Sequence, residues 1–244
     1  QQPTFMEIND RLPNGLTTFY LLFNEGYYSN SQNKILRKNF CLEAMRLNYL
    51  LVENEITNQP SANALLSLMC FHSSRFEART NEKDEMILYE DQDERLWNFE
   101  LIEKGIFYLN NASKNSVLTK YHIEAGIAFC HTQKEDTPKK WNSILQLYNQ
   151  LLQIEYSPVI ALNRTYALAK ANGKQVAIIE AEKLNLINNR FYYSLLGNLY
   201  TDLDNTKALH HFQTALTLAN SNAEKTTITE KINKLAANSE KNTS

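Results

Sequence analysis

The chain has little glycine or proline, with 6 Gly and 5 Pro in 244 residues. Because these two residues interrupt regular structure, their scarcity, together with long apolar patterns of helical period, predicts an all-α protein. No run approaches the roughly 18 consecutive apolar residues of a membrane-spanning helix, and no charged-then-apolar leader opens the chain. We therefore expect a cytoplasmic protein without a membrane partner. The first residue is Gln1 rather than methionine, which predicts an excised segment or a processed product.

Cysteine is also scarce, and positive charge is not in excess. Cys41, Cys70 and Cys130 lie far apart within apolar helical patterns; without metal-ligand spacing, they are predicted to be buried reduced thiols. The 25 Lys and Arg residues are scattered and are balanced by 27 Asp and Glu residues, for a net charge of −2. Duplex DNA binding relies on clustered basic residues that release counterions from phosphates. This chain by itself is not expected to bind DNA.

Patterns typical of catalysis are absent from the sequence as well. It contains no recognisable nucleophile–base pair, metal-ligand spacing or phosphate loop. Asp91 and Asp93 carry oxygen ligands, but a calcium loop also needs a glycine and a terminal glutamate at fixed spacing. Acidic residues near a helix N-terminus complement the helix dipole, and we favour this interpretation of the pair. We expect no enzyme activity, no cofactor and no metal.

The first half of the chain is predicted to be a helical domain, residues 1–112. Apolar periodicity predicts four helices, over approximately 16–28, 35–52, 62–80 and 94–110. Two motifs stand out, FYLLFNEGY at 19–27 and EDQDERLW at 90–97. Each sets polar and charged residues tightly against aromatic and aliphatic ones. A polar connection at 113–117 predicts the boundary with a second domain, residues 113–244.

The second half contains an internal repeat. In three segments a small residue is followed three positions later by an aromatic one, namely Gly126 and Phe129, Asn163 and Tyr166, and Gly197 and Tyr200. The first members lie 37 and 34 residues apart, close to the roughly 34-residue tetratricopeptide (TPR) period. A small residue lets the partner helix approach closely, and the aromatic residue is expected to pack into the groove beside it. We expect about three TPR-like helix-turn-helix repeats, with a polar capping helix over about 224–235.

A group of charged and aromatic residues in the first half is the candidate functional site. Arg75 and Arg79 lie one turn apart on the predicted third helix and face the same way. Asp91, Asp93 and Arg95 of the EDQDERLW motif are expected to supply counter-charges, with Trp97 packed over the network. A buried ion network is costly unless fully paired, so the cluster is an internal lock, which we favour, or an interaction surface. The full set is Asn24, Glu25, Arg46, Arg75, Arg79, Asp91, Asp93, Arg95 and Trp97.

Asn24, Glu25 and Gly26 lie near the end of the first predicted helix. One hypothesis makes them a polar contact point for neighbouring protein regions. The alternative, which we favour, is a helix terminus with Gly26 in a left-handed cap. In that case Glu25 pairs with an arginine of the third helix.

Six segments of the chain can be compared with known families. They are RLPNGLTTFYLLFNEGY, CLEAMRLNYLL, ALLSLMCFHSSRFEART, LYEDQDERLWN, SPVIALNRTYALA and the final repeat, LLGNLYTDLDNTKALHHFQTALTLA. Together they resemble the C-terminal TPR-like extension of one group of extracytoplasmic-function (ECF) sigma factors of bacterial RNA polymerase. They follow the family's order and cover nearly the whole chain from Arg11. The sequence departs from the family pattern at two places. Ser73 or Ser74 stands where the family usually has an acidic residue, and TPKKW at 137–141 replaces Thr-Asp-Trp.

The resemblance implies a function in transcription. In this family the promoter-reading regions precede the repeats, and neither the region that reads the −10 element nor the helix-turn-helix for the −35 element is found in this sequence. The intact protein would direct RNA polymerase to promoters and would touch promoter DNA only through those upstream regions. This segment would contact the sigma regions of the same protein, the RNA polymerase core or a regulatory protein.

Two other classes of function stay open. One is a freestanding TPR-like scaffold that binds a peptide in its concave groove, although such a scaffold does not need the FNEGY and EDQDERLW motifs. The other is an enzyme with a polar pocket around Glu25, Arg75 and Asp91.

Overall fold

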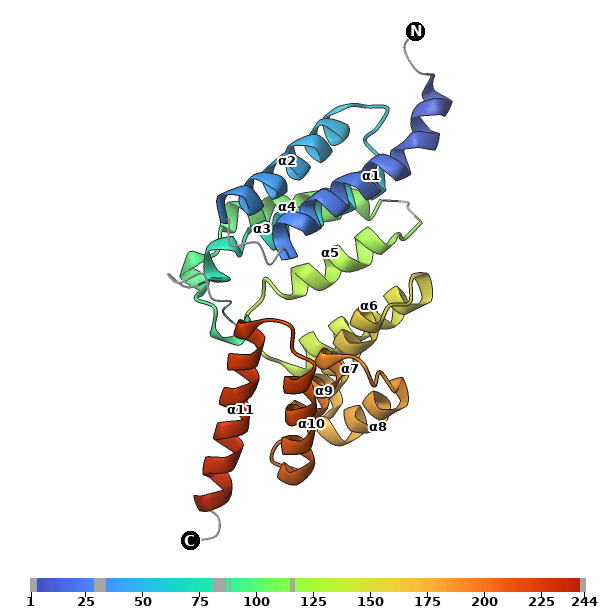
Figure 1. The fold of residues 1–244 in the computed structure, drawn as a ribbon. Coiled ribbons are helices and arrows are strands. Elements are labelled where there is room, and N and C mark those ends of the chain that lie inside the picture. The colour runs from blue at the N-terminus through green and yellow to red at the C-terminus, as the bar shows by residue number, and fades with distance from the viewer. Residues whose placement is uncertain (1–3, 29–33, 81–86, 88, 115–116, 242–244) are drawn as a thin grey trace. The chain divides into compact units, whose positions relative to one another are not determined.

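The chain is built from α-helices, short 3₁₀ turns and connections (Figure 1). The computed structural model describes residues 4–28, 34–80, 87, 89–114 and 117–241. Over these ranges it contains no β-strand, so the all-α prediction is confirmed. The chain forms two compact units, residues 1–135 and 136–244.

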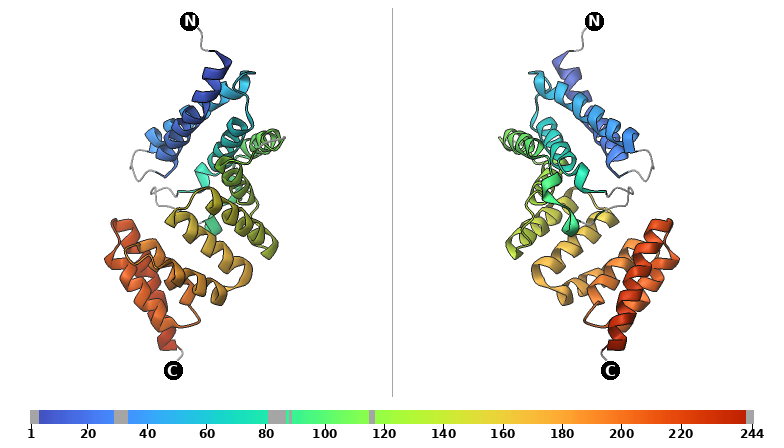
Figure 2. Two further views of the ribbon diagram at one scale, coloured as in Figure 1. Left: turned by 90° about the vertical axis from the view of Figure 1, so that its right-hand side faces the viewer. Right: turned by 90° about the vertical axis from the view of Figure 1, so that its left-hand side faces the viewer.

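The first unit is a bundle centred on its third helix. Its helices are α1 (Phe5–Tyr28), α2 (Lys34–Glu53), α3 (Pro60–Ser73), η1 (Phe76–Ala78), η2 (Tyr89–Asp91), η3 (Glu94–Leu96), α4 (Phe99–Ala112) and α5 (Lys120–Cys130). Helices α1 and α2, drawn in blue, lie side by side, and the two views of Figure 2 show the same pair. Helix α3 packs against α1, α2, α4 and α5.

Helix α3 is buried because it is apolar around its whole circumference. Every residue from 62 to 71 is buried, as expected for a helix without a polar face. Two side chains, one on α3 and one on α2, donate to backbone carbonyls at its contacts with α4 and α2. The Ser67 hydroxyl donates to the Gly105 carbonyl at 2.7 Å, and the Asn48 amide, on α2, donates to the Ala62 carbonyl at 3.1 Å.

Three helix boundaries differ clearly from the predicted ones. Helix α1 begins at Phe5 rather than near 16, and Thr4 and Glu7 form reciprocal hydrogen bonds at its start. Local hydrogen bonds account for the other two as well. Helix α3 ends at Ser73 rather than near 80. Just after its end, the Ser74 hydroxyl donates to the Phe71 carbonyl at 2.7 Å. Serine side chains that bond to nearby backbone compete with the helical pattern. Helix α4 begins at Phe99 rather than near 94, because the Asn98 side chain accepts from the Leu101 amide at 3.0 Å and caps the helix there.

The described part of the second unit, residues 136–241, contains six helices. They are α6 (Pro138–Ile154), α7 (Pro158–Asn172), α8 (Lys174–Leu184), α9 (Arg190–Tyr200), α10 (Asn205–Thr217) and α11 (Asn222–Lys241). Helices α7 and α8 form one pair and α9 and α10 another, while α6 packs on α7 and α11 packs on α10. The predicted capping helix over 224–235 is therefore found as α11.

The last repeat has the close helix contact that the sequence predicts. A Cβ atom added to Gly197 would lie 2.7 Å from Phe212 Cδ1, nearer than real Cβ contacts allow, so α9 and α10 approach at a glycine. The first predicted repeat differs. Its first helix is α5, which packs on α3 and α4 in the first unit. The division between the compact units falls after Glu135 rather than after residue 112, and the repeated helix pairs are α7–α8 and α9–α10.

Candidate functional site

The structure brings Arg75 and Trp97 together through two adjacent backbone segments. The Asn98 amide donates to the Ser74 carbonyl at 2.7 Å, so the end of EDQDERLW runs beside the turn that follows α3. The Tyr89 ring contacts both side chains. Its centroid lies 5.4 Å from Arg75 Cζ and 6.5 Å from the centroid of the Trp97 ring. We call Arg75, Arg79, Tyr89, Trp97 and His72 the arginine–aromatic cluster.

Arg75 is buried, and none of the described carboxylates forms an ion pair with it. Its side chain is 7% exposed, and its Nε–H has no hydrogen-bond acceptor in the part of the chain that the structure describes. The predicted counter-charges lie elsewhere. Asp91 is exposed, and Asp93 binds Arg95, with Nη2 2.7 Å from Oδ2. The predicted ion network is therefore not formed by these side chains, and the prediction that they lock Arg75 internally is corrected.

Asp93 and Arg95 interact locally because Asp93 caps the short η3 turn. Its Oδ1 accepts from the Arg95 backbone amide at 3.0 Å, and the Arg95 guanidinium bonds the same carboxylate. These hydrogen bonds lower the pKa of Asp93 to about 2. The Asp93 carboxylate thus pairs within its own turn and not with Arg75.

Arg79 has partners of a different kind from Arg75. Its guanidinium carbon lies 3.7 Å from the centroid of the Tyr27 ring, and its Nη1 donates to the Tyr27 carbonyl at 3.2 Å. A cation over an aromatic face is stabilised by the ring quadrupole. Arg79 therefore fastens the C-terminal end of α1, which holds the FNEGY motif, to the segment after α3.

His72 adds polarity to this cluster without adding charge. Its ring centroid lies 4.5 Å from that of Tyr27. Burial lowers the pKa of His72 well below its usual range, and the neighbouring guanidinium groups of Arg75 and Arg79 lower it further. The imidazole is consequently neutral near pH 7, and the positive charge of the cluster resides on the two arginines.

The remaining predicted residues lie on helix surfaces. Asn24 is partly buried and Glu25 is exposed on α1, which continues to Tyr28. Gly26 is thus inside the helix, and its predicted role as a cap is wrong. Glu25 forms no ion pair with an arginine in the described ranges. Arg46 forms a local pair with Glu43 on α2, 2.7 Å between Nη2 and Oε1.

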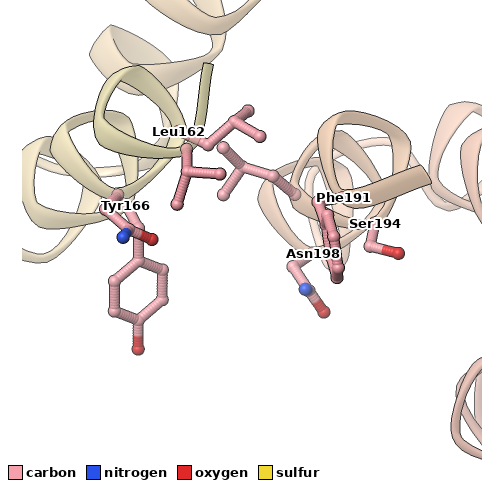
Figure 3. A pocket seen from close by; sticks show the side chains of 8 residues that line it. Leu162, Tyr166, Phe191, Ser194 and Asn198 are labelled. Carbon is pink, nitrogen blue, oxygen red and sulfur yellow. The ribbon is translucent and has the colours of Figure 1, made fainter. Parts of the chain in front are cut away.

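A groove on the second unit was not predicted as a site. It encloses about 350 Å³ between α7 and α9, and Figure 3 shows Leu162 and Tyr166 on one helix facing Phe191 and Asn198 on the other. Its lining is mainly apolar and consists of Val159, Leu162, Asn163, Tyr166, Phe191, Ser194, Leu195 and Asn198. The repeat positions Asn163 and Tyr166 were interpreted as packing residues. Their repeat equivalents, Gly197 and Tyr200, do not line the groove, so the repeat pattern carried no signal for it.

One edge of this groove carries a positive charge. Lys231, on α11, donates to the Asn198 Oδ1 at 2.9 Å. The Arg190 guanidinium carbon lies 4.3 Å from the centroid of the Phe191 ring and its Nε is 3.0 Å from Glu224 Oε1. The groove thus combines an apolar floor with amide and cationic groups on the α9 side.

The described ranges also bear on metal binding, membrane insertion and disulfide formation. No group of three or more His, Cys, Asp or Glu side chains there has a geometry that holds a metal ion. None of the helices described is both long and apolar enough to cross a membrane. Cys41 and Cys70 are buried and Cys130 is partly buried, and none of these three forms a disulfide.

Comparison with known proteins gives two matches. Residues 11–113 match a family described as "Family of unknown function (DUF6596)", a span that holds both motifs and the whole arginine–aromatic cluster. An uncharacterized protein of Rhizobium meliloti (strain 1021) is 31% identical over 241 residues, covering 97% of this chain and 57% of the relative. The chain therefore spans little more than half the length of that relative. No solved structure matches significantly.

Proposed function

We propose that this chain is a regulatory, protein-binding extension of an ECF sigma factor, and that it has no catalytic role of its own. The six segments that resemble this family, in the family's order, support the proposal. The paired helices of the second unit agree with a TPR-like extension. The longer relative agrees with a protein that has regions beyond the part matched here. In this function the partners are the sigma regions, the polymerase core or a regulatory protein, all in the cytoplasm.

The observation that carries the proposal is the groove between α7 and α9. Large apolar side chains face solvent there, with Phe191 52% exposed and Val159 57% exposed. Exposed apolar surface inside a concave site is typical of a protein-binding surface. Stacked helix pairs use their concave side in the same way. The groove therefore favours binding of a segment of another protein region over a purely structural role.

In vitro transcription tests the proposal. If sigma regions are encoded upstream of Gln1, the intact protein is compared with the same protein lacking residues 1–244. Loss of transcript means that the extension is required for an active conformation, and gain means that it is autoinhibitory. An unchanged transcript yield from every promoter tested contradicts the proposal.

A point variant localises the effect to the groove. Phe191→Ala removes an exposed aromatic ring from the lining, and Ile179→Ala removes an exposed apolar side chain from α8, outside the groove. We expect Phe191→Ala to change transcript yield in the same direction as deletion of the extension. Ile179→Ala is expected to behave like the unmodified protein. Equal effects of the two variants would assign the regulation to another surface.

The groove also supports a second candidate, a freestanding TPR-like scaffold that binds a peptide. The two functions are distinguished by the coding sequence before Gln1. Sigma regions there support the first, and a start codon directly at this position supports the second.

A further inference from the structure

The capping helix α11 contacts the α9 wall of the groove at two places. Its residues Glu224 and Lys231 are seven positions apart in the sequence and therefore lie on the same face of the helix. The Glu224 carboxylate pairs with Arg190 at the start of α9, 3.0 Å between Oε1 and Nε. The Lys231 ammonium donates to the Asn198 Oδ1 near the end of α9, at 2.9 Å. Helix α11 thus borders the groove from one end of this wall to the other.

The two contacts bring different charges to the two ends of the wall. Arg190 and Glu224 form an ion pair, so their charges cancel. At the other end Lys231 donates to a neutral amide, and its ammonium lies 5.7 Å from the centroid of the Phe212 ring. The eight lining residues are all uncharged. At its Asn198 end the groove therefore has a cation in direct contact with its lining.

The charge of the second unit as a whole has the same sign. Residues 136–244 contain 12 Lys and Arg against 9 Asp and Glu, a net charge of +3, although the whole chain has a net charge of −2. Complementary charge steers association and selects among partners more than it adds affinity. An acidic partner segment is favoured over a basic one for this reason.

The groove has the size of a site for side chains rather than for a folded surface. Its volume of about 350 Å³ is near the lower end of the range for ligand pockets. Leu162 and Leu195 are almost wholly buried and form its floor, whereas Tyr166 and Phe191 are exposed and form its walls (Figure 3). An apolar side chain of a peptide segment fits between these walls.

We propose that the groove binds a partner segment in which an acidic residue lies close to an apolar one, and that Lys231 selects the acid. The apolar side chain packs on Leu162 and Leu195, while the carboxylate accepts from the Lys231 ammonium in place of Asn198. Helix α11 then determines specificity in addition to covering the end of the repeats. This inference rests on the proposed function, since it names the chemistry of the segment that the groove takes.

Selection from random peptides displayed on phage tests the preference for acid. The peptides are selected on the whole unmodified chain, and those that bind the Phe191→Ala variant equally well are discarded. We expect the remaining peptides to be enriched in Asp or Glu close to an apolar residue. The same selection on Lys231→Glu is expected to replace this acidic preference by Lys or Arg.

Fluorescence anisotropy of one selected peptide, labelled with fluorescein, measures the contribution of Lys231. Lys231→Met is expected to weaken binding about tenfold or more. Lys234→Met, which removes an exposed lysine of the same helix, should leave the affinity unchanged. Replacing the acid of the peptide by its amide should weaken binding to the unmodified chain as much as Lys231→Met does, and this comparison requires no variant to fold.

The outcomes separate this inference from the proposed function. Groove-specific peptides without acidic enrichment, or an unchanged acidic preference on Lys231→Glu, overturn the inference and leave the proposed function intact. If every selected peptide binds Phe191→Ala as well as the unmodified chain, the groove takes no segment, and the proposed function is contradicted too. A dimer in sedimentation velocity that Phe191→Ala dissociates would make a second copy of the chain the occupant and overturn the acidic partner.

Discussion

Gly105 lies directly against the ring of Phe71. A Cβ atom added at Gly105 would come within 2.5 Å of Phe71 Cε1, and Phe71 is fully buried. This contact sets the approach of α4 to the central helix α3. The second unit contains an equivalent pair, because Phe212 meets Gly197 in the same way. Each unit thus joins two helices through an aromatic ring that occupies the space of a missing side chain.

Gly105→Ala is expected to destabilise the chain by about 2 kcal/mol, the usual cost of forcing an extra group into a packed core. A thermal or urea melt measures this loss. Gly15→Ala is the matched control, since nothing lies within 4 Å of a Cβ added at that helical position. There, alanine is expected to raise stability by about 0.5–1 kcal/mol. If Gly105→Ala melts like the unmodified chain, the two helices do not meet as described.

Replacing Phe71 by a smaller residue is expected to relieve part of the Gly105→Ala penalty. The double variant Phe71→Leu/Gly105→Ala should lose less stability than the sum of the two single variants, because both act on one contact. If the stability loss of the double variant equals the sum of the two single losses, the two residues do not share the contact described.

His72 is expected to make the stability of the chain depend on pH. Its folded-state pKa is lowered by burial and by Arg75 and Arg79, so the unfolded state binds the proton more readily. The contribution of the neutral His72 to the free energy of unfolding is fully present above the unfolded-state pKa near 6.5. It is lost as the pH falls from there toward the folded-state pKa. We expect a loss of roughly 1–2 kcal/mol between pH 7 and pH 5. Urea melts at a series of pH values measure it.

His72→Phe is the informative variant for this prediction. It keeps an aromatic ring against Tyr27 but removes the titrating group. Its stability is expected to fall less steeply over the same pH range. Burial also lowers the pKa of His122 and His211, so a smaller slope remains. His210→Asn, at an exposed position, should leave the curve unchanged. A His72→Phe curve parallel to that of the unmodified chain would contradict a buried neutral imidazole.

The sequence predicts the elements of this fold better than their ends. Ten consecutive buried positions in α3 follow from an apolar run, because burial of apolar area dominates the choice of core. The end of the same helix depends on whether the Ser74 hydroxyl bonds Phe71 or solvent. The predicted boundary between domains was early for a similar reason, since α5 carries repeat-like residues but packs on α3.

For the candidate site, sequence patterns select the residues but do not say which of them pair with one another. Arg75 and Trp97 were correctly selected as neighbours, but Asp93 was expected to serve Arg75 and instead bonds Arg95, two residues away. A list of charges does not say whether a local partner or a distant one prevails. Tyr166 was interpreted as core because aromatic residues at helical spacing usually pack inside. Its exposure, 41%, depends on how the helices α7 and α9 are placed.

Asp136 is expected to stabilise the second unit through two donors. Its Oδ2 lies 2.6 Å from Lys170 Nζ, and its carboxylate accepts the buried Trp141 indole N–H. Asp136→Ala leaves that N–H unpaired, which should cost about 1–3 kcal/mol, most of it from the indole because the ion pair is largely exposed and screened. Glu43→Ala, which removes only the exposed pair with Arg46, is the control and should change the melting temperature little.

Acid should act on the same contact. The hydrogen bond from Lys170, followed by that from Trp141, lowers the pKa of Asp136. The stability that the ionised Asp136 contributes is therefore complete above the ordinary Asp pKa. It is lost as the pH falls through the lower pKa of the folded state. Melts below about pH 4 should show a smaller acid loss for Asp136→Asn than for the unmodified chain. Equal acid losses would mean that the carboxylate is not paired.

Phe191 and Tyr192 are neighbours in sequence on different faces of α9, so their variants distinguish an effect on binding from an effect on folding. Tyr192 is 6% exposed, whereas Phe191 is 52% exposed and lines the groove. Tyr192→Ala is expected to cost about 3–5 kcal/mol, as for other large-to-small changes in a core, and Phe191→Ala less than about 1 kcal/mol. Phe191→Ala should then change transcription or peptide binding without changing the melt. If it destabilises as much as Tyr192→Ala, the ring belongs to the core of the unit and the groove does not bind a partner through it.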